Sequence, residues 1–248
     1  MPDGVTYPLL VIDAGNTAVK FASVQRPDAS PKLLATMATE KLSAARARKF
    51  FPAAASIVIS SVVPAASRTL RLAFPAARFL GPRTPLNFTT RVDRRTVGSD
   101  RLANMAAAAQ RRKSSVLVIG CGTATTFDVL DADGVHQGGA IAPGWRTFAT
   151  ALAAKAAKIP AVKLRRPVSW TGRNTRDALT AGIAGGYGAM VDGLIDRLAG
   201  PRRWRVVFTG GDAALVAGLI RHKVFLDPLW TLRGIAILGR QSGLGGRN

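Results

Sequence analysis

A strand-and-turn pattern that occurs twice constrains this chain more than any other feature. Its first copy, residues 9–17, reads LLVIDAGNT: an apolar run, an acid, a glycine and two small polar residues. The apolar run predicts a buried strand, and Gly15 lets the backbone approach a ligand closely. Asn16 and Thr17 offer short donors, and Asp13 can hold a cation beside a phosphate. Taken alone, these residues also suit an ordinary hairpin turn.

The same pattern returns later in the chain. Residues 117–124 (LVIGCGTA) repeat residues 10–17 (LVIDAGNT), with three identical apolar residues and the glycine at the same offset. We expect two copies of one strand–turn–strand unit, in domains 1–112 and 113–248, that present their turns to a shared cleft. A third glycine turn, Thr209–Asp212, follows another predicted strand.

The remaining pattern alternates strands with helices, which predicts an α/β chain. Strands are predicted at 18–24, 33–39, 56–62, 78–80, 125–130, 137–141 and 205–208. Helices are predicted at 40–50, 65–74, 102–112, 145–158, 176–198, 213–220 and 230–238. Residues 138–144 (GGAIAPG) are expected to form a glycine-rich bend. Ser99 or Asp100 is a good N-cap for the helix that follows.

Four glycines lie inside the predicted helix 176–198, namely Gly182, Gly185, Gly186 and Gly188. Each costs a helix about 1 kcal/mol relative to alanine. They therefore imply close packing against another backbone, and the seam of a helix–helix dimer is one place where this occurs.

Charge and composition limit the classes of partner. The 248 residues carry a net charge of +21. Such a charge can indicate a polyanion such as nucleic acid. The basic clusters do not form one stripe with interleaved aromatics, so we expect a solvated surface and no nucleic-acid partner. No apolar run of about eighteen residues occurs, so no membrane span is expected. The single cysteine, Cys121, allows no internal disulfide and fits a reducing, cytoplasmic compartment.

Six motifs in order carry a resemblance to a known family. They are DAGNT at 13–17, VGSDRLAN at 97–104, GTATTFD at 122–128, GGAIAPG at 138–144, GRNTRDALTAG at 172–182 and TGGDA at 209–213. With them the chain resembles the type III pantothenate kinases, a family of the sugar kinase, heat-shock ATPase and actin superfamily. The resemblance implies an α/β fold of two duplicated ribonuclease H-like, actin-like ATPase domains with a cleft between them.

The resemblance also implies an activity and its requirements. The activity is phosphorylation of pantothenate by ATP, the first step of coenzyme A biosynthesis. The requirements are Mg²⁺ and a monovalent cation, K⁺ or NH₄⁺, in a homodimer.

Each matched residue takes a role from the resemblance. Asp13 and Asp100 are the expected catalytic residues: Asp13 would hold Mg²⁺ through water, and Asp100 would take the proton of the pantothenate hydroxyl. The residues expected to bind ATP and its phosphates are Asp13, Gly15, Asn16, Thr17, Lys20, Gly122, Thr123, Thr125, Gly210 and Gly211. The residues expected to bind the substrate are Gly98, Ser99, Asp100, Arg101 and Thr175, the last acting across the dimer. Asp128 is expected to face the monovalent cation.

Many of these residues also have a simpler interpretation. Asp13 suits a turn, and Asp100 and Thr175 suit helix caps. Asp128 and Lys20 suit exposed positions on strands. Outside the motifs, His136 and His222 suit the surface, and Cys121 suits the core.

Three places depart from the family pattern. The second phosphate turn of the family begins with an aspartate, but here Gly120 stands opposite Asp13 in the repeat. Arg91 and Arg94 occupy positions where the family usually has a tyrosine and a proline against the substrate. Arg233 replaces a glutamate in the last helix.

These departures keep other hypotheses open. Loss of the second acid should weaken the placement of Mg²⁺–ATP. The chain would then be a kinase-fold protein with weak or no activity that binds nucleotide or regulates. Arginines in the pocket would suit a more acidic substrate, and a polyanion-binding role rests on charge alone.

Overall fold

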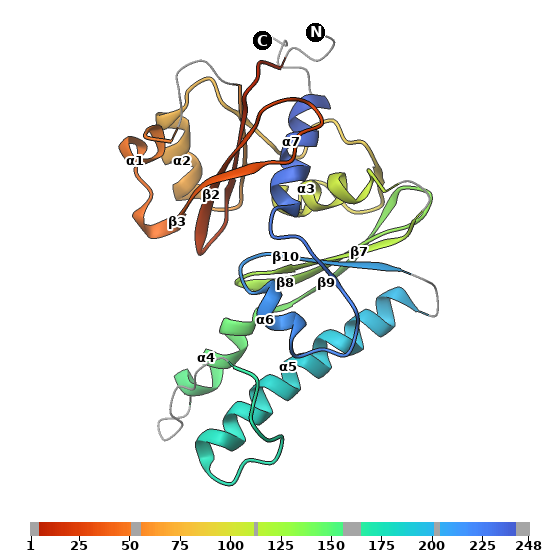
Figure 1. Cartoon of the computed structure of the whole chain (residues 1–248). Helices are drawn as coiled ribbons and strands as arrows, with labels where there is room; N and C mark the ends of the chain where they lie inside the picture. The colour runs from red at the N-terminus through yellow and green to blue at the C-terminus, as the bar shows by residue number, and fades with distance from the viewer. Residues whose placement is uncertain (1–4, 51–55, 112–113, 156–164, 201–203, 242–248) are drawn as a thin grey trace. The chain divides into compact units, whose positions relative to one another are not determined.

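The computed structural model describes residues 5–50, 56–111, 114–155, 165–200 and 204–241 (Figure 1). Contacts between residues group the chain into two compact units. The first holds Met1–Lys113, Leu130–Gln137 and Leu229–Asn248, and the second holds Ser114–Val129 and Gly138–Pro228. The first change of unit falls beside the expected boundary at residue 112, while the last helix groups with the N-terminal residues.

A five-stranded sheet with the order β3-β2-β1-β4-β5 forms the first unit. β1 runs antiparallel to β2 and parallel to β4, and β4 runs parallel to β5. The elements of this unit are β1 (Leu9–Ala14), β2 (Ala18–Val24), β3 (Lys32–Ala38), the 3₁₀ turn η1 (Thr39–Lys41), α1 (Ala44–Arg48), β4 (Ile57–Ser61), α2 (Pro64–Ala73), β5 (Arg78–Phe79), β6 (Thr89–Thr90), α3 (Ser99–Ala108) and α7 (Trp230–Gln241).

Helices cover both faces of this sheet (Figure 1). α1 and α2 pack Ala47 and Leu70 into one core cluster with Ile59 of β4. The neighbouring Val58 points to the opposite face, where α7 brings Gly239 against its side chain. Burial of both faces explains why β1 is a nearly continuous apolar run.

The second unit repeats this plan. Its elements are β7 (Val116–Cys121), β8 (Ala124–Leu130), β9 (Val135–Pro143), α4 (Trp145–Lys155), α5 (Thr175–Ala199), β10 (Arg205–Thr209), α6 (Ala213–Ala217) and β11 (Phe225–Leu226). The last residue of β8 and the first three residues of β9 group with the first unit. The order β9-β8-β7-β10-β11 matches β3-β2-β1-β4-β5 strand for strand, and β6 pairs with the first residues of β9. β1 and β7 also share one burial pattern, in which only the fifth residue is not fully buried. The predicted duplication is confirmed.

α5 is the core helix of the second unit. Its buried face includes Ile183, Tyr187 and Val191, in one cluster with Phe127 and Phe208 of the sheet. Among the described residues, α5 alone is long and apolar enough to cross a membrane, with a mean hydropathy of 1.2, and half of that window is buried. The packing is that of a core helix.

Some predicted elements differ from the structure. The helix predicted at 40–50 is a 3₁₀ turn followed by α1, because Leu42 is extended and Ser43 caps α1 by accepting a hydrogen bond from the backbone N–H of Arg46. The predicted bend at 138–144 is largely strand β9, and the helix predicted at 213–220 ends at Ala217. The predicted end of the helix at residue 158 lies outside the described residues.

The glycines of α5 do not share one cause. Gly188 does meet another backbone, since a Cβ there would lie 2.5 Å from the carbonyl oxygen of Leu219. Gly185 faces the ring of Trp170, and Gly182 has open space around it. The expectation of close backbone packing is therefore correct for Gly188 and wrong for Gly182 within this chain.

Gly234→Ala is expected to destabilise the first unit. A Cβ at this position of α7 would lie 1.7 Å from the carbonyl oxygen of Ala103 in α3, so the two helices must separate. Such overpacking typically costs about 1–3 kcal/mol. Gly182→Ala is the matched control, because its open surroundings should give a gain of up to about 1 kcal/mol. Urea unfolding of both variants checks this, and equal stabilities would contradict it.

Candidate active site

The turn between β1 and β2 is held by backbone hydrogen bonds and by one threonine. The N–H of Gly15 donates to the carbonyl of Ala18 at 3.1 Å, which closes the turn. Thr39 braces it from the end of β3: its hydroxyl donates to the Gly15 carbonyl at 2.7 Å, and its N–H donates to the Thr17 carbonyl at 3.0 Å. Asn16 and Thr17 are exposed on this fixed turn. The backbone that carries these two residues is therefore held in place, which suits the phosphate contact predicted for them.

Two carboxylates of the first unit lie close enough to affect each other. Asp13 stands near the end of β1, with Lys20 of β2 and Ser60 of β4 as its partners in the sheet. Asp13 keeps partial contact with solvent, but the atoms around its carboxylate desolvate it. This desolvation, together with the negative charge of Asp100, raises the pKa of Asp13 from 3.8 to about 7, against a lowering effect of Lys20.

The start of α3 fixes Asp100 in this position. The helix begins at Ser99, with Gly98 as N-cap and no side-chain capping bond, so the prediction that Ser99 or Asp100 caps the helix is wrong. The Ser99 hydroxyl is instead buried and 2.9 Å from that of Ser60. Asp100 accepts a hydrogen bond from the N–H of Arg101 at 2.8 Å. A Cβ on Gly98 would lie 2.5 Å from the Asp100 carboxylate, so a side chain there would shift this carboxylate from its present position.

The second turn, between β7 and β8, is one residue shorter than the first. The N–H of Gly122 donates to the carbonyl of Ala124 at 3.1 Å. Gly144 lies directly on this turn: its N–H donates to the Thr123 carbonyl at 3.0 Å, and a Cβ there would lie 2.0 Å from the Gly122 carbonyl oxygen. The Thr147 hydroxyl donates to the same Thr123 carbonyl at 2.8 Å. Hydrogen bonds from Gly144 and Thr147 thus fix the second turn, including the exposed Thr123, as Thr39 fixes the first turn.

Thr125 is not on the surface of this turn. It is fully buried, and its hydroxyl lies 2.5 Å from the Tyr187 hydroxyl of α5. The contact of Thr125 with phosphate remains a prediction. In this structure its hydroxyl already hydrogen-bonds Tyr187 inside the unit.

The third turn, after β10, packs on the end of β7. Gly210 has φ +100°, and a Cβ there would lie 2.3 Å from the Cys121 carbonyl oxygen. That carbonyl accepts a hydrogen bond from the N–H of Asp212 at 3.2 Å. Gly211 is exposed, with open space around it. The second unit therefore brings the Gly122–Thr123 and Gly210–Gly211 turns to the adjacent ends of β7 and β10.

The alternative in which Asp128 is simply exposed is wrong, and so is the prediction that His136 lies on the surface. Asp128 is fully buried on β8, where the first unit has the equally buried Ala22. His136 is fully buried, with Nδ1 3.2 Å from the Thr90 hydroxyl, because β6 pairs with the start of β9 and covers it. His222 is half-buried, and its Nε2 lies 2.9 Å from the Asp196 carboxylate. Cys121 is buried, as predicted, and burial raises the pKa of its thiol to about 12.

Thr175 is the first residue of α5 and does not reach the turns of its own unit. It is exposed, about three helical turns before Tyr187. The cap of α5 is Asn174, whose side chain accepts a hydrogen bond from the N–H of Asp177 at 2.9 Å. Gly172 packs on the same turn, since a Cβ there would lie 2.1 Å from the Ala178 nitrogen.

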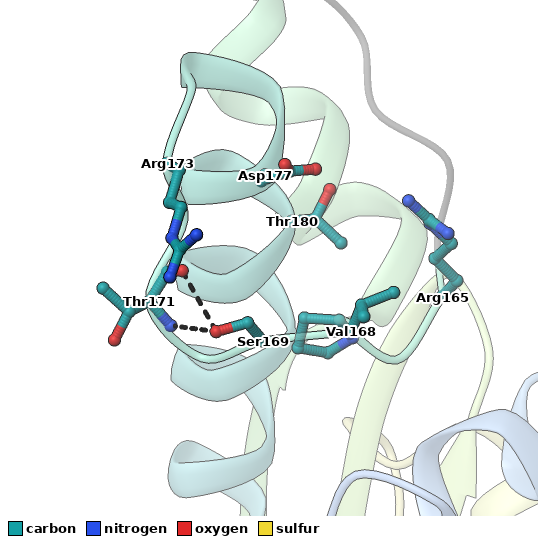
Figure 2. Close-up of a pocket in the computed structure, with 8 residues that line it drawn as sticks. Arg165, Val168, Ser169, Thr171, Arg173, Asp177 and Thr180 are labelled. Atoms are coloured by element: carbon teal, nitrogen blue, oxygen red, sulfur yellow. Dashed lines mark hydrogen bonds between the residues drawn. The ribbon is translucent and has the colours of Figure 1, made fainter.

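A pocket lies beside the start of α5 (Figure 2). It has a volume of about 420 Å³, and the segment before the helix runs along α5 to form its wall. The Ser169 hydroxyl holds this segment, because it donates to the Thr171 carbonyl and accepts from the Thr171 N–H, both at 3.1 Å. Arg173 and Asp177 line the pocket, but Thr175 does not.

The structure also shows the positions and contacts of the residues that depart from the family pattern. Gly120 is the register partner of Thr209, whose buried hydroxyl has no hydrogen-bond partner among the residues that the structure describes. The Arg94 guanidinium donates to the Thr84 carbonyl, and that of Arg233 donates to the Ser30 hydroxyl at 2.6 Å. These two arginines thus tie parts of the first unit together. Arg91 is exposed beside β6.

The two units differ in how well they fit a divalent cation. Asp13 and Asp100 offer carboxylate oxygens, the ligands that Mg²⁺ prefers, and their mutual repulsion would be relieved by a cation. Gly120 offers no side chain at the matching position of the second unit. In the part of the chain that the structure describes, no group of three or more His, Cys, Asp or Glu residues gathers.

Two ribonuclease H-like units, each with a glycine turn at the end of its central strand, define the class of actin-like ATPases and sugar kinases. A Baf family protein from Campylobacter jejuni matches with a TM-score of 0.62 and 20% identity, over 94% of this chain and 98% of that one. The activator of 2-hydroxyisocaproyl-CoA dehydratase from Clostridium difficile, solved with bound ADPNP, matches with a TM-score of 0.52 and 14% identity, over 94% and 93%. The predicted fold is confirmed.

The family follows from sequence. Residues 9–197 match the family described as type III pantothenate kinase. The type III pantothenate kinase of Anaeromyxobacter dehalogenans (strain 2CP-C) is 40% identical over 191 residues, which cover 74% of this chain and 75% of that protein. The chain belongs to the type III pantothenate kinase family, as its motifs predicted, and family and fold together support the use of ATP.

Four residues at these turns were not predicted from sequence. Thr39 and Thr147 brace the β1–β2 and β7–β8 turns, Ser60 holds the start of α3, and Arg146 pairs with Asp212. Ser60 had a weak signal, because two hydroxyl residues end an otherwise apolar strand. The others lie far along the chain from the turns that they hold.

Asp13→Asn is expected to stabilise the folded chain at pH 8 when no nucleotide or divalent cation is present. Because the pKa of Asp13 is raised to about 7 on folding, the folded state binds a proton that the unfolded state lacks between about pH 4 and pH 7. The parent therefore loses stability as pH rises through this window, and asparagine removes that loss.

Thermal unfolding with EDTA measures this effect. We expect a higher Tm for Asp13→Asn by about 2 °C or more at pH 8, the shift produced by about 1 kcal/mol in a chain of this size, and a smaller gain at pH 5. Asp133→Asn, at an exposed turn position, should show no such trend. A gain that is larger at pH 5 than at pH 8 would contradict the assignment.

Proposed function

We propose that this chain transfers the γ-phosphoryl group of ATP to the hydroxyl of pantothenate, the first step of coenzyme A biosynthesis. Family membership supports the reaction, and the single structural observation that carries it is that the start of α3, which bears Asp100, is held beside Asp13: Ser60, the register partner of Asp13, hydrogen-bonds Ser99. In the reaction, the bond between the γ-phosphorus and the β,γ-bridging oxygen breaks, and a bond forms from the hydroxyl oxygen to phosphorus. Asp100 accepts the hydroxyl proton.

Phosphoryl transfer depends mainly on positioning and on neutralisation of charge. Asp13 would hold Mg²⁺ through water, and the cation would supply positive charge to the phosphate oxygens. The Gly15–Thr17 turn and Lys20 would contact the phosphates from the first unit. Gly122 and Thr123 would do so from the second unit, with Gly210 and Gly211 against the adenosine. The threonine braces at both turns support this proposal, since each keeps its turn preorganised.

The substrate and cation assignments extend the proposal. Gly98 and Arg101 would place pantothenate beside Asp100, with Ser99 acting through its hydrogen bond to Ser60. The exposed position of Thr175, distant from the turns of its own unit, suits a contact with the substrate of a second copy in a homodimer. The buried Asp128 would support the monovalent cation, K⁺ or NH₄⁺, and the compartment would be the cytoplasm.

Asp100→Asn should lower the turnover number about 10²–10⁴-fold, the usual contribution of a general base, and leave ATP binding within about twofold. Phosphopantothenate formation with ATP, Mg²⁺ and K⁺ measures the first, and calorimetry measures the second. Asp133→Asn is the matched control and should keep full activity. Parent-level turnover in Asp100→Asn would exclude Asp100 as the base.

Gly120 favours a second candidate function, nucleotide binding with weak or no turnover. The missing carboxylate removes the acid that the family pattern places beside the second phosphate turn. Under the proposed function, the parent forms phosphopantothenate at a measurable rate, and Gly120→Asp alters the Mg²⁺ dependence of that rate. If the parent binds ATP but forms no product at high enzyme concentration, the second candidate replaces the first.

A further inference from the structure

The backbone of Arg146 lies beside the β7–β8 turn, the second of the two proposed phosphate turns. It lies in the first turn of α4, between Gly144 and Thr147, the two residues that hydrogen-bond the Thr123 carbonyl. The backbone of Gly144 contacts the Gly122 carbonyl so closely that no side chain fits there. The backbone of Arg146 is therefore fixed beside the Gly122–Thr123 turn.

The guanidinium of Arg146 contacts the third turn, which follows β10. Its Nε donates to Oδ1 of Asp212 at 3.1 Å, and one terminal nitrogen lies 3.1 Å from the same oxygen. Asp212 directly follows Gly210–Gly211, and its N–H donates to the Cys121 carbonyl. Arg146 thus spans the two glycine turns that the proposed function assigns to ATP, within one unit.

Asp212 is used for this contact and not for its own helix. It is the N-cap residue of α6, yet its side chain makes no capping hydrogen bond. Its side chain is 9% exposed, whereas that of Arg146 is 67% exposed. A guanidinium has five N–H donors, and the carboxylate engages only part of them. The remaining donors of Arg146 are held in place and open to solvent.

We propose that Arg146 binds the phosphates of the nucleotide in the second unit, with Asp212 as its positioning residue. This inference rests on the proposed use of ATP and deepens it. A family member with an acid at position 120 would gather positive charge there through a cation. This chain has Gly120 and supplies the charge through the guanidinium, whose planar fork suits phosphate oxygens. Phosphate binding here depends less on Mg²⁺ as a result.

Calorimetric titration with ATP and with adenosine tests the proposal. Arg146→Ala should weaken ATP binding about tenfold or more, as loss of a charge-assisted contact does, and change adenosine binding by less than about twofold. Arg146→Lys keeps the charge but loses the planar guanidinium, so its affinity for ATP should lie between those of the parent and Arg146→Ala. Arg197→Ala, which removes an exposed arginine of the same unit, is the matched control and should bind both ATP and adenosine as the parent does. Unchanged ATP binding in Arg146→Ala overturns the proposal.

A double-mutant cycle tests Asp212 as the positioning residue. Asp212→Asn alone should weaken ATP binding but not adenosine binding, and it should cause no further loss in the Arg146→Ala background. An equal loss in both backgrounds would assign Asp212 a role independent of Arg146. Unchanged adenosine binding also shows that each variant keeps its folded site.

Removal of Mg²⁺ with EDTA separates this inference from its alternatives. The parent should lose less than about tenfold in ATP affinity, and Gly120→Asp should lose more than the parent. A larger loss in the parent would mean that the cation, not Arg146, neutralises the phosphates.

The two proposals can fail separately. If the parent binds ATP through Arg146 but does not phosphorylate pantothenate, the proposed function fails and this inference stands. If the parent makes phosphopantothenate while Arg146→Ala keeps parent ATP affinity, the inference fails and the proposed function stands.

Discussion

The burial of one carboxylate beside another is the constraint on which the candidate site of the first unit depends. Desolvation of Asp13, together with the negative charge of Asp100, raises the pKa of Asp13 to about 7, so the folded chain holds the two acids together at a cost in stability. That cost is met by the packing around them. The buried Ser60–Ser99 hydrogen bond fixes the start of α3, and α7 presses on α3 with no Cβ between the helices at Gly234. The acid pair thus lowers the stability of the folded chain, which is typical of functional sites and agrees with the proposed role of these two residues.

The two units keep one backbone plan while their side chains have diverged. Each turn has a hydroxyl brace from a segment far along the chain, Thr39 in one unit and Thr147 in the other. The side chains that would meet phosphate differ, because Asp13 has a counterpart in Gly120. The second unit instead directs Arg146 and Asp212 to the same region. Sheet topology depends on backbone hydrogen bonds, and the turns are braced by uncharged hydroxyls, so both survive substitutions that change the charge of the site.

Much of the fold could be predicted because hydrophobic periodicity reports burial directly. β1 and β7 were predictable as apolar runs, and the sequence pattern that they share predicted that the strand–turn–strand unit is duplicated. The helix expected at 40–50 failed because Ser43 provides a local cap inside the periodic stretch, and local hydrogen bonds compete with helix propensity. The prediction of a surface position for His136, and the alternative of an exposed Asp128, were wrong for another reason. Their burial depends on which strands and helices cover them, and this depends on pairings such as β6 with β9.

The sequence by itself determined the family, the two strand–turn–strand units and the identity of the acids Asp13 and Asp100, because these are carried by contiguous residues with their own spacing. Only the tertiary structure decided that Asp13 and Asp100 are electrostatically coupled, that Thr125 faces Tyr187, and that Arg146 connects two glycine turns. Each of these depends on residues brought together across long separations. Such contacts are set by packing of whole elements, which no local pattern of residues encodes.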